Sequence, residues 1–456
     1  MCGILAIQGP YDIHRAMRAH SSMSYRGTNE PNTRRIVSTD EFFCGHNTLP
    51  LSSERGTAQP RKVECWGGEK RIGMFVGEIF NWKELSERFP IESTSDTVLA
   101  NHLFPNIYDD KINRAVHDID GFWSYVLTDH MDLVAYTDYL AQKPLFYRTD
   151  MNAVCSEPEP LTMLADTDID EHYISNTLKW GYSPDGRTPW KQIKQIPPGC
   201  VYQNGEISEY YDWDMVQAEE DVYGLLDVFE KAVKDRVFAT KKIGILLSGG
   251  IDSSLVYLTA KKYSNDIQSF HIENGESEFV RMVDPDSISL QSTEVTSAEA
   301  VRALQTPSDL GSTLPQTSLA KAVNAEGIRA VLTGDGADEL FGGYRRAKEY
   351  DSQLSDVFSE LPYYHFQRLD RIMMRYTIEQ RSPFLNPVIV KSALSIPYHR
   401  RQEKEMVKTM ARAQGVPSEI VDRPKVPLKS SQVKSDPIKH RQELLDEWRK
   451  LFEGEK

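Results

Sequence analysis

The stretch 245–254, ILLSGGIDSS, brings small and polar residues to the point where an apolar run ends and a helical pattern begins. Gly249 and Gly250 would let a ligand approach the backbone closely, and the N–H groups at the start of a helix suit pyrophosphate oxygens. The hydroxyls of Ser248 and Ser253 could add to this site. No lysine follows the glycines, so the loop is not of the GxxxxGK[ST] type. Cleavage of ATP to AMP and pyrophosphate is therefore more consistent than transfer of the terminal phosphoryl group.

A second glycine-rich turn, AVLTGDGADELFGGY at 330–344, carries the carboxylates Asp335, Asp338 and Glu339. Carboxylate oxygens are preferred ligands of Mg²⁺. Taken alone, the stretch could equally be a solvated acidic loop. Together with Asp252 of the first loop, it predicts a Mg²⁺ ion that bridges ATP phosphates.

Cys2 follows the initiator methionine and precedes Gly3. Removal of Met1 would place a free α-amine beside the thiol, and an α-amine with a pKa near 8 can act as a general base on its own side chain. Cys2 is then a candidate nucleophile for attack on an amide. A buried apolar cysteine at the start of a strand is the alternative.

The elements that must position these residues change character along the chain. From residue 2 to about 210, short β-rich runs alternate with polar turns, and one helical stretch is expected near 95–104. Asn204-Gly205 predicts a hairpin that joins two short strands in 196–210. This pattern indicates a layered, mostly antiparallel first domain. The β-rich runs are 3–9, 71–81, 121–129 and 133–139.

An acidic stretch at 212–221 indicates a linker, with a boundary near 212–222. Beyond it, strands alternate with helices, which predicts a parallel sheet with helices on its faces. The remainder after 344 is expected to be mostly helical. The stretch between SFHI (269–272) and the helix near 319–326 shows no clear helix with an acidic start.

Bulk composition narrows the function classes. The 456 residues suggest two domains, and the net charge of -14 with a pI near 5.4 argues against a nucleic-acid partner. The five cysteines lack CxxC spacing, and no histidine has metal-ligand spacing with a cysteine. An apolar stretch of membrane-spanning length is also missing from the sequence. We expect a soluble, cytoplasmic protein with no membrane partner.

The chain resembles glutamine-dependent asparagine synthetases, in which a class II glutamine amidotransferase domain precedes a PP-loop synthetase domain. In the first half the resemblance rests on MCGI, Arg26-Gly27, AQP (58–60), GEIFN (77–81), TSD (94–96), QKPLFY (142–147) and IPPG (196–199). In the second half it rests on LLSGGIDSS, SFHI, GDGADELFGGY, QRSPFLN (380–386) and RPK (423–425).

The resemblance implies an Ntn-hydrolase-like αββα domain at 1–212 and an α/β PP-loop domain of the adenine nucleotide alpha hydrolase type at 213–456. It also implies that Cys2 is the glutaminase nucleophile, that Gly77 donates an oxyanion-hole N–H, and that Glu78 and Asp96 bind the amino group of glutamine. Asp335 and Lys425 would face the acyl-adenylate. ATP would be held by Leu246, Ser248, Gly249, Gly250, Asp252, Ser253, Thr333 and Gly334, and Mg²⁺ by Asp252 and Asp338.

The implied reaction is amidation of aspartate through β-aspartyl-AMP. ATP is consumed, Mg²⁺ is required, and glutamine supplies the ammonia. Ammonia released into neutral water is mostly protonated, so the interface between the domains is expected to be apolar. A homodimer is left open.

Two positions depart from the family pattern. Val76 stands where an oxyanion-hole asparagine is usual, and Thr48 stands where an arginine usually clamps the α-carboxylate of glutamine. Arg26 or Arg55 could replace the missing clamp. These departures predict weakened or altered use of glutamine.

Three other interpretations stay open. The chain could be an ammonia-dependent or β-lactam-synthetase-like amide former whose first domain is a scaffold. It could amidate an acceptor other than aspartate, or it could be a non-catalytic binding protein that keeps the fold.

Overall fold

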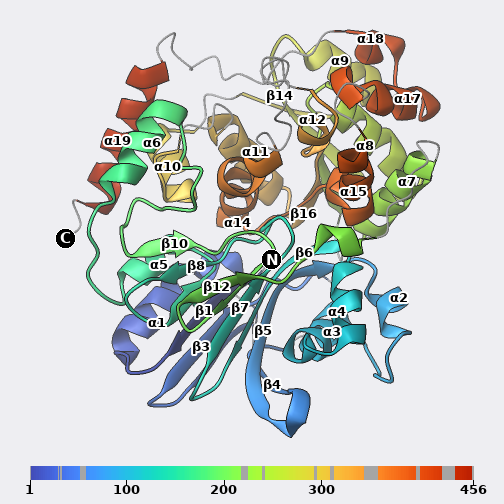
Figure 1. Cartoon of the computed structure of the whole chain (residues 1–456). Coiled ribbons are helices and arrows are strands. Elements are labelled where there is room, and N and C mark those ends of the chain that lie inside the picture. Colours follow the sequence, from blue (N-terminus) through green and yellow to red (C-terminus); the bar gives the residue numbers. More distant parts are fainter. Residues whose placement is uncertain are drawn as a thin grey trace.

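The computed structural model describes residues 2–28, 30, 33–51, 58–216, 224–238, 242–291, 295–308, 313–343, 358–396, 401–423 and 437–453. Two antiparallel six-stranded sheets form the first half, and one parallel five-stranded sheet forms the second (Figure 1). The antiparallel first domain and the parallel second sheet that the sequence predicts are both confirmed.

The first sheet has the strand order β10-β8-β9-β1-β3-β2, and the second has the order β12-β11-β7-β6-β5-β4. The strands of the first are β1 (Gly3–Gln8), β2 (Arg34–Ser38), β3 (Phe42–Asn47), β8 (Phe146–Arg148), β9 (Ala153–Cys155) and β10 (Ile193–Gln195). Those of the second are β4 (Arg61–Glu64), β5 (Lys70–Ile79), β6 (Gly121–Thr128), β7 (Leu133–Thr137), β11 (Cys200–Gln203) and β12 (Glu206–Glu209).

Helices cover the outer faces of these two sheets, which gives the expected αββα layering (Figure 1). Every residue of β6 is buried, because its sheet packs against the first sheet on one face and against α3 and α4 on the other. The prediction of one helix near 95–104 was incomplete, because the first half contains other helices besides α3, which lies at that position. The helices are α1 (Ile13–Ser22), α2 (Trp82–Ser86), α3 (Asp96–Leu103), α4 (Asp110–His117), α5 (Pro158–Thr162) and α6 (Glu171–Trp180).

The predicted hairpin is confirmed: β11 pairs with β12, and Asn204 and Gly205 both have positive φ, at 50° and 98°. Positive φ at both central residues is what a tight type I′ turn needs. Residues 217–221 of the predicted linker lie outside the described residues.

The sheet of the second half has the order β15-β14-β13-β16-β17, and all its neighbouring strands are parallel. Its strands are β13 (Ile243–Leu246), β14 (Ile267–Ile272), β15 (Ile288–Leu290), β16 (Ala330–Leu332) and β17 (Glu379–Arg381). The helices around it are α7 (Gly224–Arg236), α8 (Ile251–Lys261), α9 (Ser277–Val283), α10 (Ser297–Leu304), α11 (Thr313–Ala325), α12 (Ala337–Leu340), α14 (Met373–Arg375), α15 (Pro387–Ser395), α17 (Glu405–Ala413), α18 (Ser418–Val421) and α19 (Pro437–Phe452).

One expectation for this half was wrong. The stretch after SFHI, expected to lack a clear helix with an acidic start, contains α9, which has Glu278 in its first turn, and α10, which begins at a capping box in which Thr296 and Glu299 satisfy each other's backbone N–H. The described residues after 344 are mostly helical, as expected, and they also contribute β17 to the sheet. A strand of three residues is too short to show a β pattern in the sequence.

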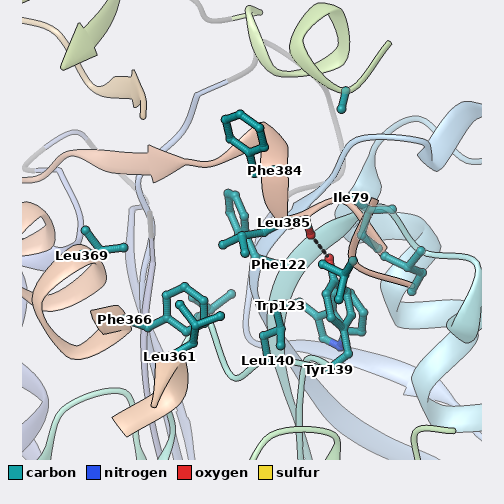
Figure 2. Packing of buried hydrophobic residues seen from close by; sticks show 14 of the residues in the cluster. Ile79, Phe122, Trp123, Tyr139, Leu140, Leu361, Phe366, Leu369, Phe384 and Leu385 are labelled. Carbon is teal, nitrogen blue, oxygen red and sulfur yellow. Dashed lines mark hydrogen bonds between the residues drawn. The ribbon is translucent and has the colours of Figure 1, made fainter. Parts of the chain in front are cut away.

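An apolar core continues across the boundary between the two halves (Figure 2). Tyr139 of the first half donates a hydrogen bond of 2.8 Å to the carbonyl of Leu385 in the second. The buried side chains around this bond come from both halves and include Ile79, Phe122, Trp123, Leu140, Leu361, Phe366, Leu369 and Phe384. This part of the interface is thus apolar, as expected, whereas buried ion pairs such as Arg236–Asp120 and Arg26–Asp370 cross the boundary elsewhere.

The C-terminal helix α19 returns to the first half, where it lies beside α6 (Figure 1). The rings of Trp190 and Trp448 lie 5.6 Å apart, and Arg441 donates to the carbonyls of Leu178 and Lys179. None of the described helices combines the length and the apolar character that crossing a lipid bilayer requires.

Candidate active site

The two glycine-rich loops meet at the carboxyl ends of β13 and β16. The chain runs from β13 outward through β14 and β15 on one side, and β16 and β17 lie on the other side. Ligands in open parallel sheets bind at such a switch point. A Cβ atom on Gly334 would lie 2.7 Å from the Cβ of Asp252 and 2.9 Å from the backbone N of Ser253. The loops therefore touch, and only glycine fits at this contact.

The first loop is held by its own hydroxyls. Ser253 Oγ accepts from the backbone N of Ser248 at 3.1 Å, lies 3.0 Å from Ser248 Oγ and donates to the carbonyl of Gly250 at 3.2 Å. Gly249 has a φ of 75°, which favours glycine. Gly250 caps α8 without a side chain, so the first N–H groups of α8 are left without a side-chain cap and suit an anionic ligand.

The two predicted metal ligands are brought together by a residue that the sequence analysis missed. The ammonium group of Lys404 pairs with both Asp252 and Asp338, and it lies 2.5 Å from Asp338 Oδ1. Lys404 is buried, and although burial disfavours its charge, the two carboxylates raise its pKa above the ordinary value. Both Glu403 and Lys404 have left-handed φ, at 59° and 60°.

These carboxylates fit the Mg²⁺ ion that the resemblance in sequence implies. They converge closely enough to share one cation, and Mg²⁺ usually takes one or two protein carboxylates together with substrate phosphates. No group of three or more potential metal-ligating side chains gathers among the residues that the structure describes. A metal here would therefore depend on ligands from the nucleotide and would compete with Lys404 for the two carboxylates.

Asp335 is placed by two polar side chains of the second half. Its carboxylate accepts from Gln380 Nε2 at 3.0 Å and from Arg368 Nη2 at 3.4 Å. The same amide of Gln380 donates to Thr333 Oγ1 at 3.0 Å. Thr333 and Asp335 thus share one anchor on β17.

The remaining predicted residues of this half are placed only in part. Leu246 ends β13, half-buried, immediately before the first loop. Lys425 lies outside the described residues. Arg423, two positions earlier, donates to the carbonyl of Gly249 at 2.7 Å, which brings the first residue of the RPK string to the first loop.

In the first half, Cys2 is almost fully buried ahead of β1. Burial raises the pKa of its thiol, a backbone N–H from Leu49 opposes the rise, and the carboxylates of Glu379 and Asp96 add to it. The thiol therefore needs a local base in order to act as a nucleophile. Met1, whose removal would free the α-amine, is outside the described residues.

Gly77, Glu78 and Asp96 lie around the end of β5. Gly77 has a φ of 144°, and a Cβ atom there would collide with the carbonyl oxygen of Phe122. Asp96 accepts from the backbone N of Ile79 at 3.3 Å. Because Asp96 also acts electrostatically on the thiol of Cys2, the predicted glutamine-binding carboxylate and the predicted nucleophile lie at the same end of the domain.

Arg26, expected as one candidate clamp for glutamine, is used elsewhere. It is fully buried, donates from Nε to the carbonyl of Cys2 at 3.0 Å, and pairs with Glu157 at 2.5 Å and Asp370 at 2.8 Å. Burial opposes its charge, but these two carboxylates raise its pKa. Because its N–H groups are engaged in this way, the guanidinium holds the backbone at Cys2 in place rather than binding a ligand. Arg55, the other candidate, lies outside the described residues.

Both departures from the family pattern sit in ordered surroundings. Val76 is buried within β5, and the hydroxyl of Thr48 lies 2.9 Å from His46 Nδ1. His46 Nε2 lies 3.1 Å from the carbonyl oxygen of Phe75. A carbonyl can only accept, so Nε2 carries the proton and Nδ1 accepts from Thr48.

One short strand connects the two centres. On β17, Gln380 reaches Thr333 and Asp335, whereas its neighbours Glu379 and Arg381 belong to the opposite face because side chains alternate along a strand. Arg381 pairs with Glu379 at 2.7 Å and lies 3.9 Å from Glu78. Glu379 in turn acts electrostatically on Cys2.

Comparison with known proteins agrees with this division. The asparagine synthase family model matches residues 224–362 and 351–454, and the glutamine amidotransferase domain model matches residues 1–213. The glutamine-hydrolysing asparagine synthetase of Zea mays is 24% identical over 443 residues, which cover 87% of this chain and 70% of that protein. Asparagine synthetase B of Escherichia coli (strain K12) is 25% identical over 455 residues, covering 87% of this chain and 75% of that protein.

Among solved structures, the chain is similar to the glutamine phosphoribosylpyrophosphate amidotransferase of B. subtilis, with 10% identity and a TM-score of 0.35 over 73% of this chain and 81% of that one. This score is too low to add to the argument. The family model of the second half, by contrast, spans more than half of the sequence. With an amidotransferase domain ahead of its synthase domain, the chain belongs to the asparagine synthase family.

Proposed function

We propose that the protein makes asparagine from aspartate, ATP and glutamine. In this scheme Cys2 releases ammonia from glutamine in the first domain. The second domain converts aspartate and ATP to β-aspartyl-AMP and pyrophosphate, and ammonia then expels AMP. The family's synthase domain implies the use of ATP in general, and the identity of the acceptor belongs to the proposal.

The observation that carries the proposal is the position of β17 between the two centres. Its Gln380 anchors Asp335 beside the nucleotide loops, and its Arg381 faces Glu78 beside the predicted glutamine site. A scaffold domain without chemistry would not require a shared strand that touches both sets of polar residues. The apolar part of the interface around Tyr139 and Leu385 also suits the transfer of uncharged ammonia.

Each residue of the nucleotide site has a defined task in this proposal. The N–H groups of α8 and the backbone at Gly249 and Gly250 bind phosphate oxygens. Asp252 and Asp338 would hold Mg²⁺, which would neutralise charge on the phosphates. Lys404 would balance the remaining charge of the two carboxylates, and Asp335 and Lys425 would face the activated carbonyl group.

In the first domain, the α-amine of Cys2 would take the thiol proton, and the backbone N–H of Gly77 would stabilise the oxyanion, a contribution on the order of 3 kcal/mol. Glu78 and Asp96 would bind the ammonium group of glutamine.

One observation favours a second candidate, an amide synthetase that uses free ammonia. The buried Val76 has no polar atom on its side chain, and Arg26 is held by Glu157 and Asp370. Loss of one oxyanion donor costs a factor of about 10² to 10³ in rate. Glutamine use would then be slow while the second domain stays active.

One assay separates these possibilities. The purified protein is incubated with ATP, Mg²⁺ and aspartate, together with either glutamine or ammonium, while pyrophosphate and asparagine are measured. Asparagine from both nitrogen sources supports the first proposal, and asparagine from ammonium alone supports the second. An absence of pyrophosphate under both conditions would refute synthesis from aspartate. Cys2→Ala is expected to abolish only the glutamine-driven reaction.

A further inference from the structure

A small polar cavity lies where the two domains meet, apart from both centres described above. Tyr173, Arg187 and Gln195 of the first domain line it, as do Ser308, Gln367 and Arg371 of the second. Its volume is about 20 Å³, which is room for a group little larger than one water molecule. Both charged side chains in its lining are arginines.

Arg371 is fully buried, and one part of its guanidinium has no partner. Its Nε donates to Glu157 Oε2 at 3.0 Å, and its Nη1 donates to Gln367 Oε1 at 3.0 Å. Its Nη2 is buried and makes no hydrogen bond within the part of the chain that the structure describes. A buried N–H of a charged group that lacks an acceptor costs free energy. A ligand that accepts a hydrogen bond from Nη2 would remove this cost.

The buried charges around Arg371 do not balance. Three cations (Arg26, Lys143 and Arg371) are linked to two carboxylates (Glu157 and Asp370), and all five side chains are at most 3% exposed. Burial alone would raise the pKa of Asp370, but the neighbouring Arg26 and Lys143 lower it to about 2. Asp370 is therefore ionised at neutral pH and supplies one of the two negative charges. The cluster carries a net charge of +1, which favours an anion in the adjoining cavity.

The second arginine of the lining forms its ion pairs with residues outside the cavity. Arg187 pairs with Asp170 at 2.9 Å and with Asp185 at 2.8 Å, and neither aspartate lines the cavity. The side chain of Asp185 is 37% exposed, so water screens its charge. Asp170 is only 6% exposed and compensates the charge of Arg187, so the attraction for an anion comes from Arg371 and its cluster.

The hydroxyls in the lining can complete an anion site. Tyr173 Oη lies 3.0 Å from Ser308 Oγ, which lies 3.3 Å from Thr306 Oγ1. Hydroxyls rotate to suit their partners, so this row can turn one O–H toward the cavity. A planar carboxylate has two oxygens and can accept from Arg371 and from the hydroxyl row at once.

We propose that this cavity binds the carboxylate group of a small organic acid, and that the bound anion holds the two domains together. Because Arg26 of the same cluster contacts the carbonyl of Cys2, the ligand also steadies the segment that carries the predicted nucleophile. The proposal does not depend on the reaction of either centre.

The test uses formate, the smallest carboxylate, with the full chain. Thermal unfolding is followed as sodium formate replaces sodium chloride at constant ionic strength, in the absence of ATP and amino acids. A saturable rise in the unfolding temperature, on the order of 2 °C, is expected. A flat curve would overturn the proposal, because it would show that formate binds in the cavity no better than water or chloride.

Two variants and one control assign the effect to the cavity. Arg371→Gln removes the unpartnered donor and leaves the other four charges of the cluster balanced, and Ser308→Val removes a hydroxyl and fills part of the space. Both are expected to lose the formate response. Arg375→Gln removes an arginine of the next helical turn that does not line the cavity, and it should keep the response. Should Arg371→Gln fail to fold, Ser308→Val decides, and a formate response that persists in it would overturn the proposal.

Discussion

Arg236 of the second domain forms a two-pronged ion pair with Asp120 of the first, with its Nη2 2.5 Å from Oδ1 and its Nη1 2.9 Å from Oδ2. Both residues are buried. We predict that Asp120→Ala lowers the free energy of unfolding by about 3–5 kcal/mol, because the arginine is left as an uncompensated buried charge. Chemical denaturation measures this loss.

The matched control for that substitution is Asp422→Ala. Asp422 pairs with Arg412, and both of these side chains are more than half exposed, so a change of at most about 1 kcal/mol is expected. Equal effects at Asp120 and Asp422 would contradict the importance assigned to the domain-bridging pair.

Lys404 is expected to compete with metal for Asp252 and Asp338. In Lys404→Gln the two carboxylates lose the cation that they share, and their mutual repulsion is relieved by a divalent ion. We predict that Mg²⁺ binds this variant on the order of tenfold more tightly than the wild type in the absence of ATP, as judged by Mg²⁺-dependent thermal stabilisation. Lys408→Gln, which removes only a lysine paired with an exposed glutamate, should behave like the wild type. An unchanged Mg²⁺ affinity in Lys404→Gln would show that the lysine does not occupy the metal's place.

The two glycine-rich loops could be predicted because their signal is local. A strand, two glycines and a helix start within ten consecutive residues, and the sheet then brings Asp252 and Asp338 together as expected. The helix α10 could also have been found, since Thr296 and Glu299 have the spacing of a capping box. Both cases rest on neighbours in the chain.

Lys404 and the role of Arg26 could not be predicted in this way. Lys404 reaches its carboxylates through a loop in which Glu403 and Lys404 have left-handed φ, and neither residue is a glycine that would indicate such a loop in the sequence. Arg26 pairs with Asp370 across 344 positions of sequence. Long-range ion pairs depend on the tertiary fold, as for Lys404, or on how the domains dock, as for Arg26, and local spacing encodes neither. The same docking placed β17 between the two centres.

Stability should fall in mild acid because of buried neutral histidines. Burial lowers the pKa of His46 to about 4 and that of His20 to about 4. The unfolded chain takes up protons near pH 6.5, whereas the native protein does not until about pH 4, so stability present above pH 6.5 is lost as the pH falls toward 4.

The histidine at position 46 can be tested directly. His46→Gln can still donate to the carbonyl of Phe75 and cannot titrate, so its unfolding midpoint should depend less steeply on pH between 6.5 and 4. The control is His14→Gln, at an exposed position, and it should keep the wild-type slope. A wild-type slope in His46→Gln would show that this imidazole does not contribute to acid sensitivity.

Gly334→Ala should separate the two half-reactions. The added methyl group would press on the Cβ of Asp252 and on the backbone of Ser253, and a displacement of about 1 Å in a catalytic site can cost about 10²-fold in rate. We predict a loss of that order in ATP-dependent pyrophosphate release and little change in glutamine hydrolysis, each assayed separately. Gly327→Ala is the control, because Gly327 lies at the opposite end of β16 from Gly334 and has open space around its Cβ position. Its positive φ should cost about 1 kcal/mol of stability without slowing pyrophosphate release. Equal losses of pyrophosphate release in the two variants would mean that general destabilisation, rather than the contact between the loops, limits the reaction.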